Sequence, residues 1–483
     1  MFSHSRHSSI TIGVMAFMGI LIMYVETMVM PAVPILMTDF NTNYDFLSWI
    51  ITAYVISGTA SAAIFGRLAD IYGKKRIFVM LALVYAITVA FGGFAQTLDE
   101  FIVVRAFQGL GMGMFPVAFA LLNDQIPKDE LPLAQGIVSS TFMGGAALGL
   151  VAGAWITKYY GWQWSYHSAI PFAVALTILS FVFLHDGSQR KSEKIDYPGV
   201  LLLTSGVLLL ILGLSEGQYW GWYSLSIITT FAVSALAMVL FVIVEARTEM
   251  PFVSLKLLRI RNVFLSNFTG LFAIAGMFFL FYSIPALLQD PEPYGFGLDI
   301  VSAGLTMLPV ALVSMALAPV SAKVTKKLGP KVSIMIGTVL LFGSFLALYY
   351  SRSTTMAVLE DVTVLGAGMS FVFVGTINIL LVSSPREEAG AATGVNVVFR
   401  NIGTALAAAI AGVLETANSV TISYPGGYSR SYPTSTGFNY VYLVGMVVLA
   451  VSVIFTLLMK NVVFARRMES PHGVETFPDS GGK

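Results

Sequence analysis

Long apolar stretches alternate with short polar ones along almost the whole chain. Fourteen of them are long enough to cross the roughly 30 Å hydrocarbon core of a bilayer, which takes about 20 helical residues. They fall at 11–37, 47–68, 77–96, 101–123, 133–157, 165–185, 197–216, 223–244, 262–289, 300–322, 331–350, 357–382, 390–414 and 438–460. A span in lipid must satisfy its own backbone hydrogen bonds, so each stretch is predicted to be an α-helix. The pattern therefore predicts an all-α polytopic membrane protein.

Composition agrees with the prediction of a membrane protein and excludes several classes of function. Of the 483 residues, 56% are hydrophobic and 11% are charged, whereas soluble domains carry about 25% charged residues. The chain has no cysteine, so a thiolate metal site or a cysteine nucleophile is excluded. We find no phosphate-binding loop of the ATPase type and no His/Asp/Glu cluster, and the net charge is +1. We therefore expect no enzyme, cofactor, metal or nucleic-acid partner.

The basic residues are unevenly divided between the two sides of the predicted membrane. With the N-terminus inside, 22 of the 27 basic residues fall in cytoplasmic segments. Three fall outside, namely Lys158, Arg352 and Arg430, and two fall within spans, namely Arg105 and Arg400. This is a clear positive-inside bias. It predicts an even number of spans with both termini cytoplasmic, and we expect a monomer in the plasma (inner) membrane.

A polar stretch between the second and third spans, GRLADIYGKKR (66–76), carries four basic residues and one acid. Gly66 and Gly73 allow a tight turn between closely packed helices. The stretch closely resembles the signature loop of the major facilitator superfamily of transporters. The residues that match at the family's spacing are Gly66, Leu68, Ala69, Asp70, Gly73, Lys74, Lys75 and Arg76. The resemblance implies a secondary transporter.

Other stretches resemble the fourteen-helix drug:proton antiporter branch of this superfamily. They are YVETMVMPAVP (24–34), RAFQGLGMG (105–113), WQWSYHSAIP (162–171), DYPG (196–199) and PFVSLKLLRIRN (251–262). The span 133–157 departs from the branch, because Leu150 stands where a proline is expected. The missing proline removes an expected kink, which weakens the inference of antiport.

A weak internal repeat gives the domain organisation. GIVSSTFMGGAAL (136–148) is echoed by GVNVVFRNIGTAL (394–406) at an offset of 258 residues, whereas two six-helix halves imply an offset of roughly 200. Two extra helices between the halves account for the difference. The expected domains are a six-helix bundle at 1–190, two inserted spans at 191–250, a second six-helix bundle at 251–467 and a polar cytoplasmic tail at 468–483.

Glu26 is the first candidate for chemistry, because it lies about 15 residues into the first span. An acid inside the membrane is costly and usually faces a cavity. Burial favours the neutral form of a carboxyl group, which is the property a proton-coupled carrier needs. The branch usually has an acid at this position. We expect Glu26 to bind a proton or a cationic substrate; a structural hydrogen bond between helices is the alternative.

Two arginines lie within spans, and a buried arginine needs an anion or several acceptors. Arg105 matches the basic residue of the branch's fourth-helix motif, and the resemblance implies a role in proton transfer beside Glu26. A structural clamp to backbone carbonyls is the alternative. Arg400 lies close to the bilayer centre, where it could pair with Glu26, bind an anionic substrate group or serve structure alone.

Asp70 is the expected centre of a gate. The resemblance implies that it contacts the N-terminal end of the span 390–414, near Ala389–Gly394, where unpaired N–H groups carry partial positive charge. This contact would hold the cytoplasmic side shut. The other expected gating residues are Arg67, Gly73, Lys74, Lys75 and Arg76. The alternative is that the charged residues of this loop only set the orientation of the spans in the membrane. Asp124 is expected to be a loop acid outside the site.

Two further sets of residues are expected to shape the transport path. Small residues four apart allow helices to approach closely, and this pattern marks Gly145, Gly149 and Gly153 as helix-packing positions. Polar and aromatic side chains within spans can line a pocket. The substrate-binding candidates are Glu26, Tyr54, Phe142, Tyr282, Asn378, Asn396 and Arg400.

The Ser-, Gly- and Tyr-rich segment 415–439 is expected to be a flexible external loop.

Three functions remain open at this stage. The preferred one is proton-coupled export of lipophilic or cationic drug-like compounds, with protons, a small-molecule substrate and the lipid bilayer as partners. The alternative is a carrier for a specific, possibly anionic, metabolite or amphiphile with weak or no proton coupling. A receptor or intramembrane enzyme on a transporter-like scaffold is the third, and no catalytic constellation in the sequence supports it.

Overall fold

The structure is a computed structural model that describes residues 6–32, 35–36, 39–40, 49–127, 130–185, 196–248, 255–385, 388–423 and 429–462. The predicted domain boundaries at 190, 250 and 467 and the tail 468–483 lie outside these residues, as does Pro34 of the first-span motif. The division into domains at those boundaries therefore remains a prediction.

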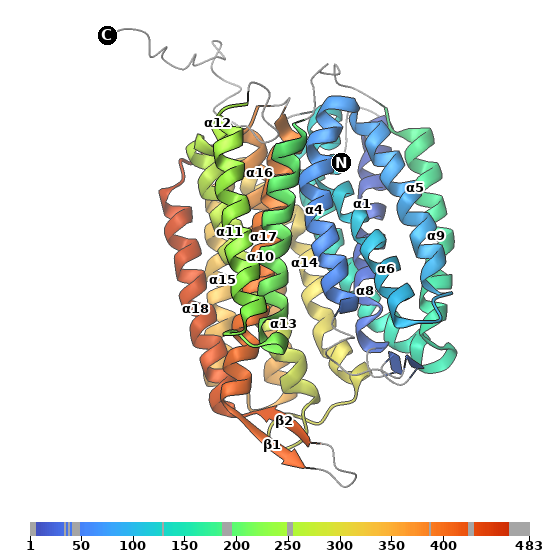
Figure 1. Ribbon diagram of the computed structural model, residues 1–483. Coiled ribbons are helices and arrows are strands. Elements are labelled where there is room, and N and C mark those ends of the chain that lie inside the picture. The colour runs from blue at the N-terminus through green and yellow to red at the C-terminus, as the bar shows by residue number, and fades with distance from the viewer. Residues whose placement is uncertain are drawn as a thin grey trace.

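Fourteen helices within the described residues are long and apolar enough to cross a membrane, so the predicted all-α polytopic fold is confirmed. They run side by side along one axis (Figure 1). The first seven spans are formed by α1 (Arg6–Thr27) with the 3₁₀ turn η1 (Met30–Ala32), α4 (Trp49–Tyr72), α5 (Lys74–Gly92), α6 (Leu98–Gly109) with η2 (Leu110–Gly113) and α7 (Met114–Gln125), α8 (Leu131–Tyr160), α9 (Trp162–Phe183) and α10 (Tyr197–Trp220). The others are α11 (Leu225–Glu245), α13 (Arg261–Gln289), α14 (Ile300–Leu328), α15 (Pro330–Tyr350), α16 (Thr355–Ser383), α17 (Ala389–Ala417) and α18 (Ser435–Leu458), with the short helix α12 (Leu255–Arg259) before α13.

The structure corrects two details of the sequence prediction. The span expected at 101–123 is present as Leu98–Gln125, but its α-helical geometry changes to the 3₁₀ turn η2 at Leu110–Gly113. Glycines in this run let the turn approach α4, where the Ser61 hydroxyl donates to the Leu110 carbonyl at 2.6 Å. The expected flexible loop at 415–439 contains an antiparallel hairpin of β1 (Ser419–Ser423) and β2 (Ser429–Pro433).

Two large apolar cores hold the helices together. One is built from α1 and α4 to α9, around residues such as Met18, Phe78 and Phe101. The other is built from α13 to α18, around residues such as Phe279, Phe345 and Leu449. In Figure 1 the first group of helices is drawn in blue to teal and the second in yellow to red, on opposite sides of the molecule.

The inserted helix α10 lies on the line where these two groups meet. Its Leu203, Val207 and Ile211 share a smaller apolar cluster with Ala63 of α4 and Val398 of α17. The Thr52 hydroxyl of α4 donates to Glu216 of α10 at 3.4 Å. Helix α11 packs along α10. The seam between α4 and α17 is thus covered by α10.

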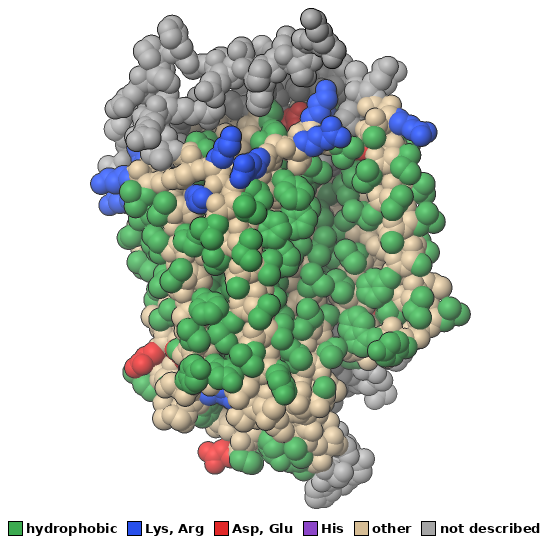
Figure 2. All heavy atoms as spheres, turned by 90° about the vertical axis from the view of Figure 1, so that its left-hand side faces the viewer, with side chains coloured by type: hydrophobic (Ala, Val, Ile, Leu, Met, Phe, Trp, Pro, Cys, Tyr) green, Lys and Arg blue, Asp and Glu red, His purple; other side chains and the backbone are tan. Residues whose placement is uncertain are grey.

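Charge distinguishes the two ends of the molecule. Figure 2 shows most visible Lys and Arg side chains gathered near one end, above a side wall that is largely hydrophobic. We call this the basic end; it carries Lys74, Lys75, Arg76, Lys256, Arg259, Arg261, Lys323, Lys327 and Lys460. The hairpin β1–β2 lies at the opposite end (Figure 1). The assignment of the basic end to the cytoplasm follows from the charge rule and remains a prediction.

Candidate functional site

Glu26 and Arg105 meet in the interior of the first helix group. Glu26 lies one residue before the end of α1, and Arg105 lies in α6. Both line a cavity of about 10 Å³ together with Val29, Ile50 and their neighbours. That volume is room for about one water molecule, so in this state of the protein the cavity beside Glu26 does not hold a drug-sized compound.

Arg105 is clamped by backbone carbonyls. Its side chain is 1% exposed, and its Nε donates to the Ile50 carbonyl at 3.2 Å. Its Nη1 donates to the Val25 carbonyl at 3.4 Å and to Gln108 Oε1 at 3.3 Å. Val25 lies in the last turn of α1, where carbonyl groups lack partners within the helix. Arg105 therefore links α1, α4 and α6. These bonds are the ones expected if Arg105 is a structural clamp to backbone carbonyls.

The Glu26 carboxyl group lies beside the Arg105 guanidinium. Its Oε2 atom is buried and has no hydrogen-bond partner of good geometry in the described part of the chain, and the nearby Tyr54 hydroxyl is the group placed to donate to the carboxyl. Arg105 and Tyr54 are the groups that act on the Glu26 carboxyl, and the Arg105 guanidinium carbon lies 4.4 Å from the Tyr54 ring centre. The carboxyl group thus keeps a free position for a proton beside a cation whose own donors go to carbonyl groups.

Arg400 occupies a separate cluster in the second helix group. Its guanidinium carbon lies 4.4 Å from the Phe373 ring centre, and its Nε is buried without a hydrogen-bond partner among the described residues. Nearby, the Asn396 amide donates to Asn267 Oδ1 at 3.0 Å. Gly270 packs against Asn396 and Arg400. No described contact joins Arg400 to Glu26, so the structure does not contain the pairing considered from the sequence.

Asp70 lies where the gate was expected. Its Oδ2 accepts a hydrogen bond from the Ala391 backbone N–H at 3.0 Å, in the first turn of α17. Beside this contact, Gly66 of α4 and Gly390 of α17 touch backbone to backbone: a Cβ added at Gly66 would lie 2.5 Å from the Gly390 carbonyl oxygen. Thr393 of α17 donates to the Pro116 carbonyl of α7 at 3.3 Å. These contacts close the basic end between the two helix groups, and their role as a gate remains a prediction.

Lys74 connects the gate to α7 and corrects the expectation for Asp124. The Lys74 ammonium is 3% exposed and lies 2.7 Å from Asp124 Oδ2 and 4.0 Å from Asp70 Oδ1. Asp124 is therefore not a loop acid: it belongs to α7 and shares a buried lysine with Asp70. A buried ion pair demands that each charge be compensated, which ties the position of Lys74 to both acids.

The remaining residues of the expected gate surround this network. Gly73 has φ 106° at the junction of α4 and α5, a conformation that favours glycine. Arg67 acts electrostatically on Asp70. Lys75 lies over the Phe181 ring at 5.6 Å, and Arg76 is exposed.

The three expected packing glycines bring α8 against α1. A Cβ at Gly149 would lie 2.5 Å from the Tyr24 carbonyl oxygen, and one at Gly153 would lie 2.5 Å from the Met28 carbonyl oxygen. Gly145 contacts the backbone of Ile20 in the same way. Backbone contact at this range leaves no room for a side chain, and it fixes the last turns of α1 that carry Glu26.

The expected substrate-binding residues are not gathered in one place. Tyr54 lies with Glu26, and Asn396 lies with Arg400. Phe142 packs its ring 4.3 Å from Phe115, measured between ring centres, within the first core. Asn378 is buried and donates to the Val374 carbonyl of its own helix at 2.7 Å. Tyr282 is 41% exposed. The described contacts therefore divide the set between the two helix groups.

Several intramembrane polar residues escaped sequence reasoning. Asp361 of α16 is buried with Oδ2 unpartnered in the described structure, and Glu415 of α17 has an unpartnered Oε1. Both act electrostatically on Tyr442 of α18. The sequence does contain a signal for both residues, since each is an acidic residue near the end of an apolar span. Glu216 of α10, which contacts Thr52, carries the same signal.

Comparison with known proteins decides the family. The sequence profile of the Major Facilitator Superfamily matches residues 15–408. The chain belongs to this superfamily. The human organic anion transporter MFSD10 (TETRAN) has the same fold, with a TM-score of 0.68 at 14% identity over 94% of this chain and 100% of that one.

Two of the relatives of this chain are bacterial proteins. The multidrug transporter protein MdtP of Bacillus subtilis is 26% identical over 401 residues, which are 81% of this chain and 72% of the relative. The tetracenomycin C resistance and export protein of Streptomyces glaucescens is 27% identical over 395 residues, which are 80% of this chain and 72% of the relative. The protein is therefore a multi-pass membrane transporter and not an enzyme.

Proposed function

We propose that this transporter exports lipophilic or cationic drug-like compounds in exchange for protons. The two bacterial relatives, a multidrug transporter and a tetracenomycin C resistance and export protein, support export of drug-like compounds. The observation that carries proton coupling is the buried Glu26 Oε2, unpartnered in the described structure, beside Arg105. We further infer that the protein is a monomer in the plasma (inner) membrane, with its basic end in the cytoplasm.

The proposed mechanism uses Glu26 as a shared site. The ionised carboxylate attracts a cationic substrate, and a proton taken up on the carboxyl group removes that attraction. The two ligands therefore compete, and alternating access turns the competition into exchange. Arg105 keeps a positive charge next to Glu26, and its hydrogen bonds to the Ile50 and Val25 carbonyls hold it there.

The gate contacts supply the second part of the cycle. In the present state, the contacts of Asp70, Gly66 and Thr393 with α17 and α7 hold the basic end shut. Opening toward that end requires the Asp70–Ala391 hydrogen bond to break as the helix groups rock apart.

Proton release from purified protein tests the proposal. In weakly buffered detergent solution without a gradient, lipophilic cations are expected to release protons from the wild type. Glu26→Gln is expected to abolish the release, because an amide carries no titratable proton. Glu100→Gln is the matched control: Glu100 is exposed in a capping box, which glutamine also supports. Unchanged release in Glu26→Gln would refute Glu26 as the coupling group.

The geometry of Arg400 favours a second candidate, a carrier for an anionic metabolite or amphiphile. A buried cation whose Nε lacks a partner among the described residues is a ready contact for an anionic group. Under this alternative, the wild type binds lipophilic anions and releases no protons with cations. Arg400→Ala would then weaken anion binding at least tenfold, as measured by equilibrium binding in detergent, while Arg247→Ala, at an exposed arginine, would not.

A further inference from the structure

A groove opens in the side of the molecule at the basic end. It has a volume of about 560 Å³ and lies between α11, α12, the start of α13 and the end of α18. Six of its eight lining residues are apolar, and the other two are Arg259 and Arg261. No acidic side chain lines it within the described residues. The groove shares no lining residue with the cavity beside Glu26.

One side of the groove is formed by the inserted helix α11, which contributes Val242 to its lining. Helix α11 packs along α10 and turns the rest of its surface outward. Val242 of α11 is 50% exposed, and Phe264 on the facing start of α13 is 45% exposed. These apolar side chains would meet hydrocarbon in a membrane, so the occupant of the groove must itself be apolar along most of its length.

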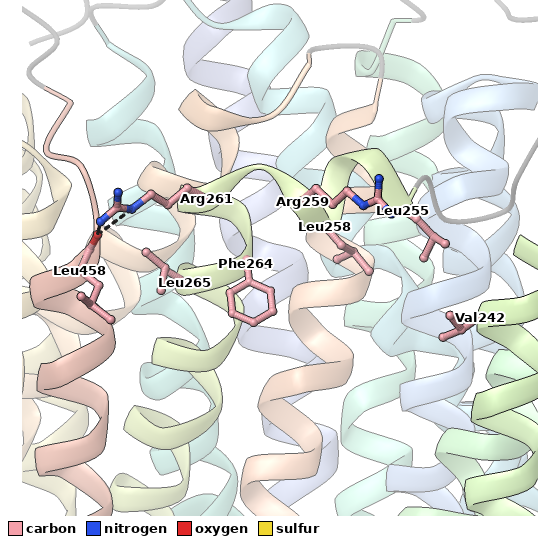
Figure 3. A pocket seen from close by; sticks show the side chains of 8 residues that line it. All are labelled: Val242, Leu255, Leu258, Arg259, Arg261, Phe264, Leu265 and Leu458. Atoms are coloured by element: carbon pink, nitrogen blue, oxygen red, sulfur yellow. Dashed lines mark hydrogen bonds between the residues drawn. The ribbon is translucent and has the colours of Figure 1, made fainter. Parts of the chain in front are cut away.

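The two arginines give the groove a charged rim. Figure 3 shows both guanidinium groups at the upper edge, with Leu258, Phe264 and Leu265 below them. Arg261 Nε and Nη2 donate to the Leu458 carbonyl at 3.1 and 2.8 Å, which holds this guanidinium in place. Arg259 is exposed, and the described residues offer it no hydrogen-bond acceptor. The Arg259 guanidinium therefore has N–H donors available for a ligand.

The rim lies at the depth where lipid headgroups begin. The span of α11 ends at Glu245 and that of α13 begins at Arg261, so a bilayer that covers these spans would have its boundary between hydrocarbon and water near α12 and both arginines. Arginine matches phosphate oxygens with a fork of parallel donors, and basic pockets between spans are typical binding sites of anionic headgroups. The apolar wall beneath fits an acyl chain.

We propose that this groove binds one anionic phospholipid of the bilayer. Its phosphate contacts Arg259 and Arg261, and an acyl chain lies along Val242, Leu258 and Phe264. The proposal does not depend on proton coupling or on the identity of the transported compound.

Native mass spectrometry of the full-length protein in detergent tests the proposal. The delipidated protein is titrated with dioleoylphosphatidylglycerol or with dioleoylphosphatidylcholine. The wild type is expected to retain one phosphatidylglycerol at concentrations where phosphatidylcholine is lost. Arg259→Gln is expected to weaken this retention roughly fivefold, the effect of one basic residue near an anionic headgroup. Lys256→Gln is the control, because it removes an equal charge from an exposed position of α12 that does not line the groove.

A second variant tests the apolar wall. Phe264→Ser is expected to weaken retention of phosphatidylglycerol without changing its preference over phosphatidylcholine, because it alters the chain site and leaves the rim intact. Equal retention of the two lipids by the wild type would overturn the proposal, as would equal losses in Arg259→Gln and Lys256→Gln. Displacement of the lipid by stoichiometric amounts of a transported compound, with weakening in Phe264→Ser, would assign the groove to substrate and also overturn it.

Discussion

Gly390→Val is expected to lower transport at least tenfold. A Cβ at residue 390 would collide with the Gly66 carbonyl oxygen and would lie 2.8 and 2.9 Å from the two Asp70 carboxylate oxygens. Overpacking of this kind costs about 1–3 kcal/mol, and here the cost falls only on the state in which α4 and α17 touch. A penalty of about 1.4 kcal/mol already shifts a two-state population tenfold. The variant should therefore favour an open basic end and stall the cycle.

Two measurements check this prediction. Export is measured in proteoliposomes with a proton gradient. The distance between spin labels attached to the basic ends of α4 and α17 is measured by double electron–electron resonance spectroscopy. Gly343→Val is the matched control, because a Cβ at that glycine of α15 meets no atom within 4 Å. Wild-type transport and an unchanged label distance in Gly390→Val would show that the closed contact is dispensable.

Arg105→Ala is expected to cost about 3 kcal/mol of stability, the lower end of the effect of removing one partner from a buried charged cluster. The substitution leaves the Val25 and Ile50 carbonyls without their donor and leaves Glu26 without its neighbouring cation. Arg105→Lys should recover part of the loss, since lysine keeps the charge but not the planar fork. Thermal unfolding in detergent measures the effect, with Arg247→Ala at an exposed position as the control.

A double-mutant cycle separates the two roles of Arg105. If the residue acts through Glu26, the effects of Arg105→Lys and Glu26→Gln on proton release should not add. If it is a clamp alone, Arg105→Lys should lower the unfolding temperature while proton release per folded molecule stays at the wild-type value. That second result would remove Arg105 from the coupling mechanism and leave Glu26 in it.

The sequence predicts the architecture because the bilayer imposes a strong local rule. Each span needs about 20 apolar residues, and basic residues mark the ends of spans, so the fourteen helices could be counted without any tertiary contact. The motif around Asp70 likewise placed its partner near Ala389–Gly394, and the structure has Asp70 on Ala391. This distant contact was expected from the resemblance to a known family of transporters and not from the local pattern of residues alone.

The rest of the site depends on contacts that no local pattern encodes. Lys74 and Asp124 are 50 residues apart, and nothing along the chain marks Asp124 as a partner. Asn267 and Asn396 are 129 residues apart. Whether Arg400 meets Glu26 depends on how the two helix groups face each other. Such distances follow from packing geometry, which the spacing of residues within one helix does not fix.

The inserted helix α10 has a consequence for lipophilic compounds dissolved in the bilayer. Because α10 covers the seam between α4 and α17, a compound diffusing sideways through the membrane on this flank meets a continuous protein wall. Gln218 of α10 lies against Gly412 of α17, and Trp220 lies near Trp49 of α4, with ring centres 6.3 Å apart. Any movement of the two helix groups against each other would have to change the contacts of α10 with α4 or with α17. Lateral access to the seam on this flank is therefore limited by α10, a helix that contacts both groups.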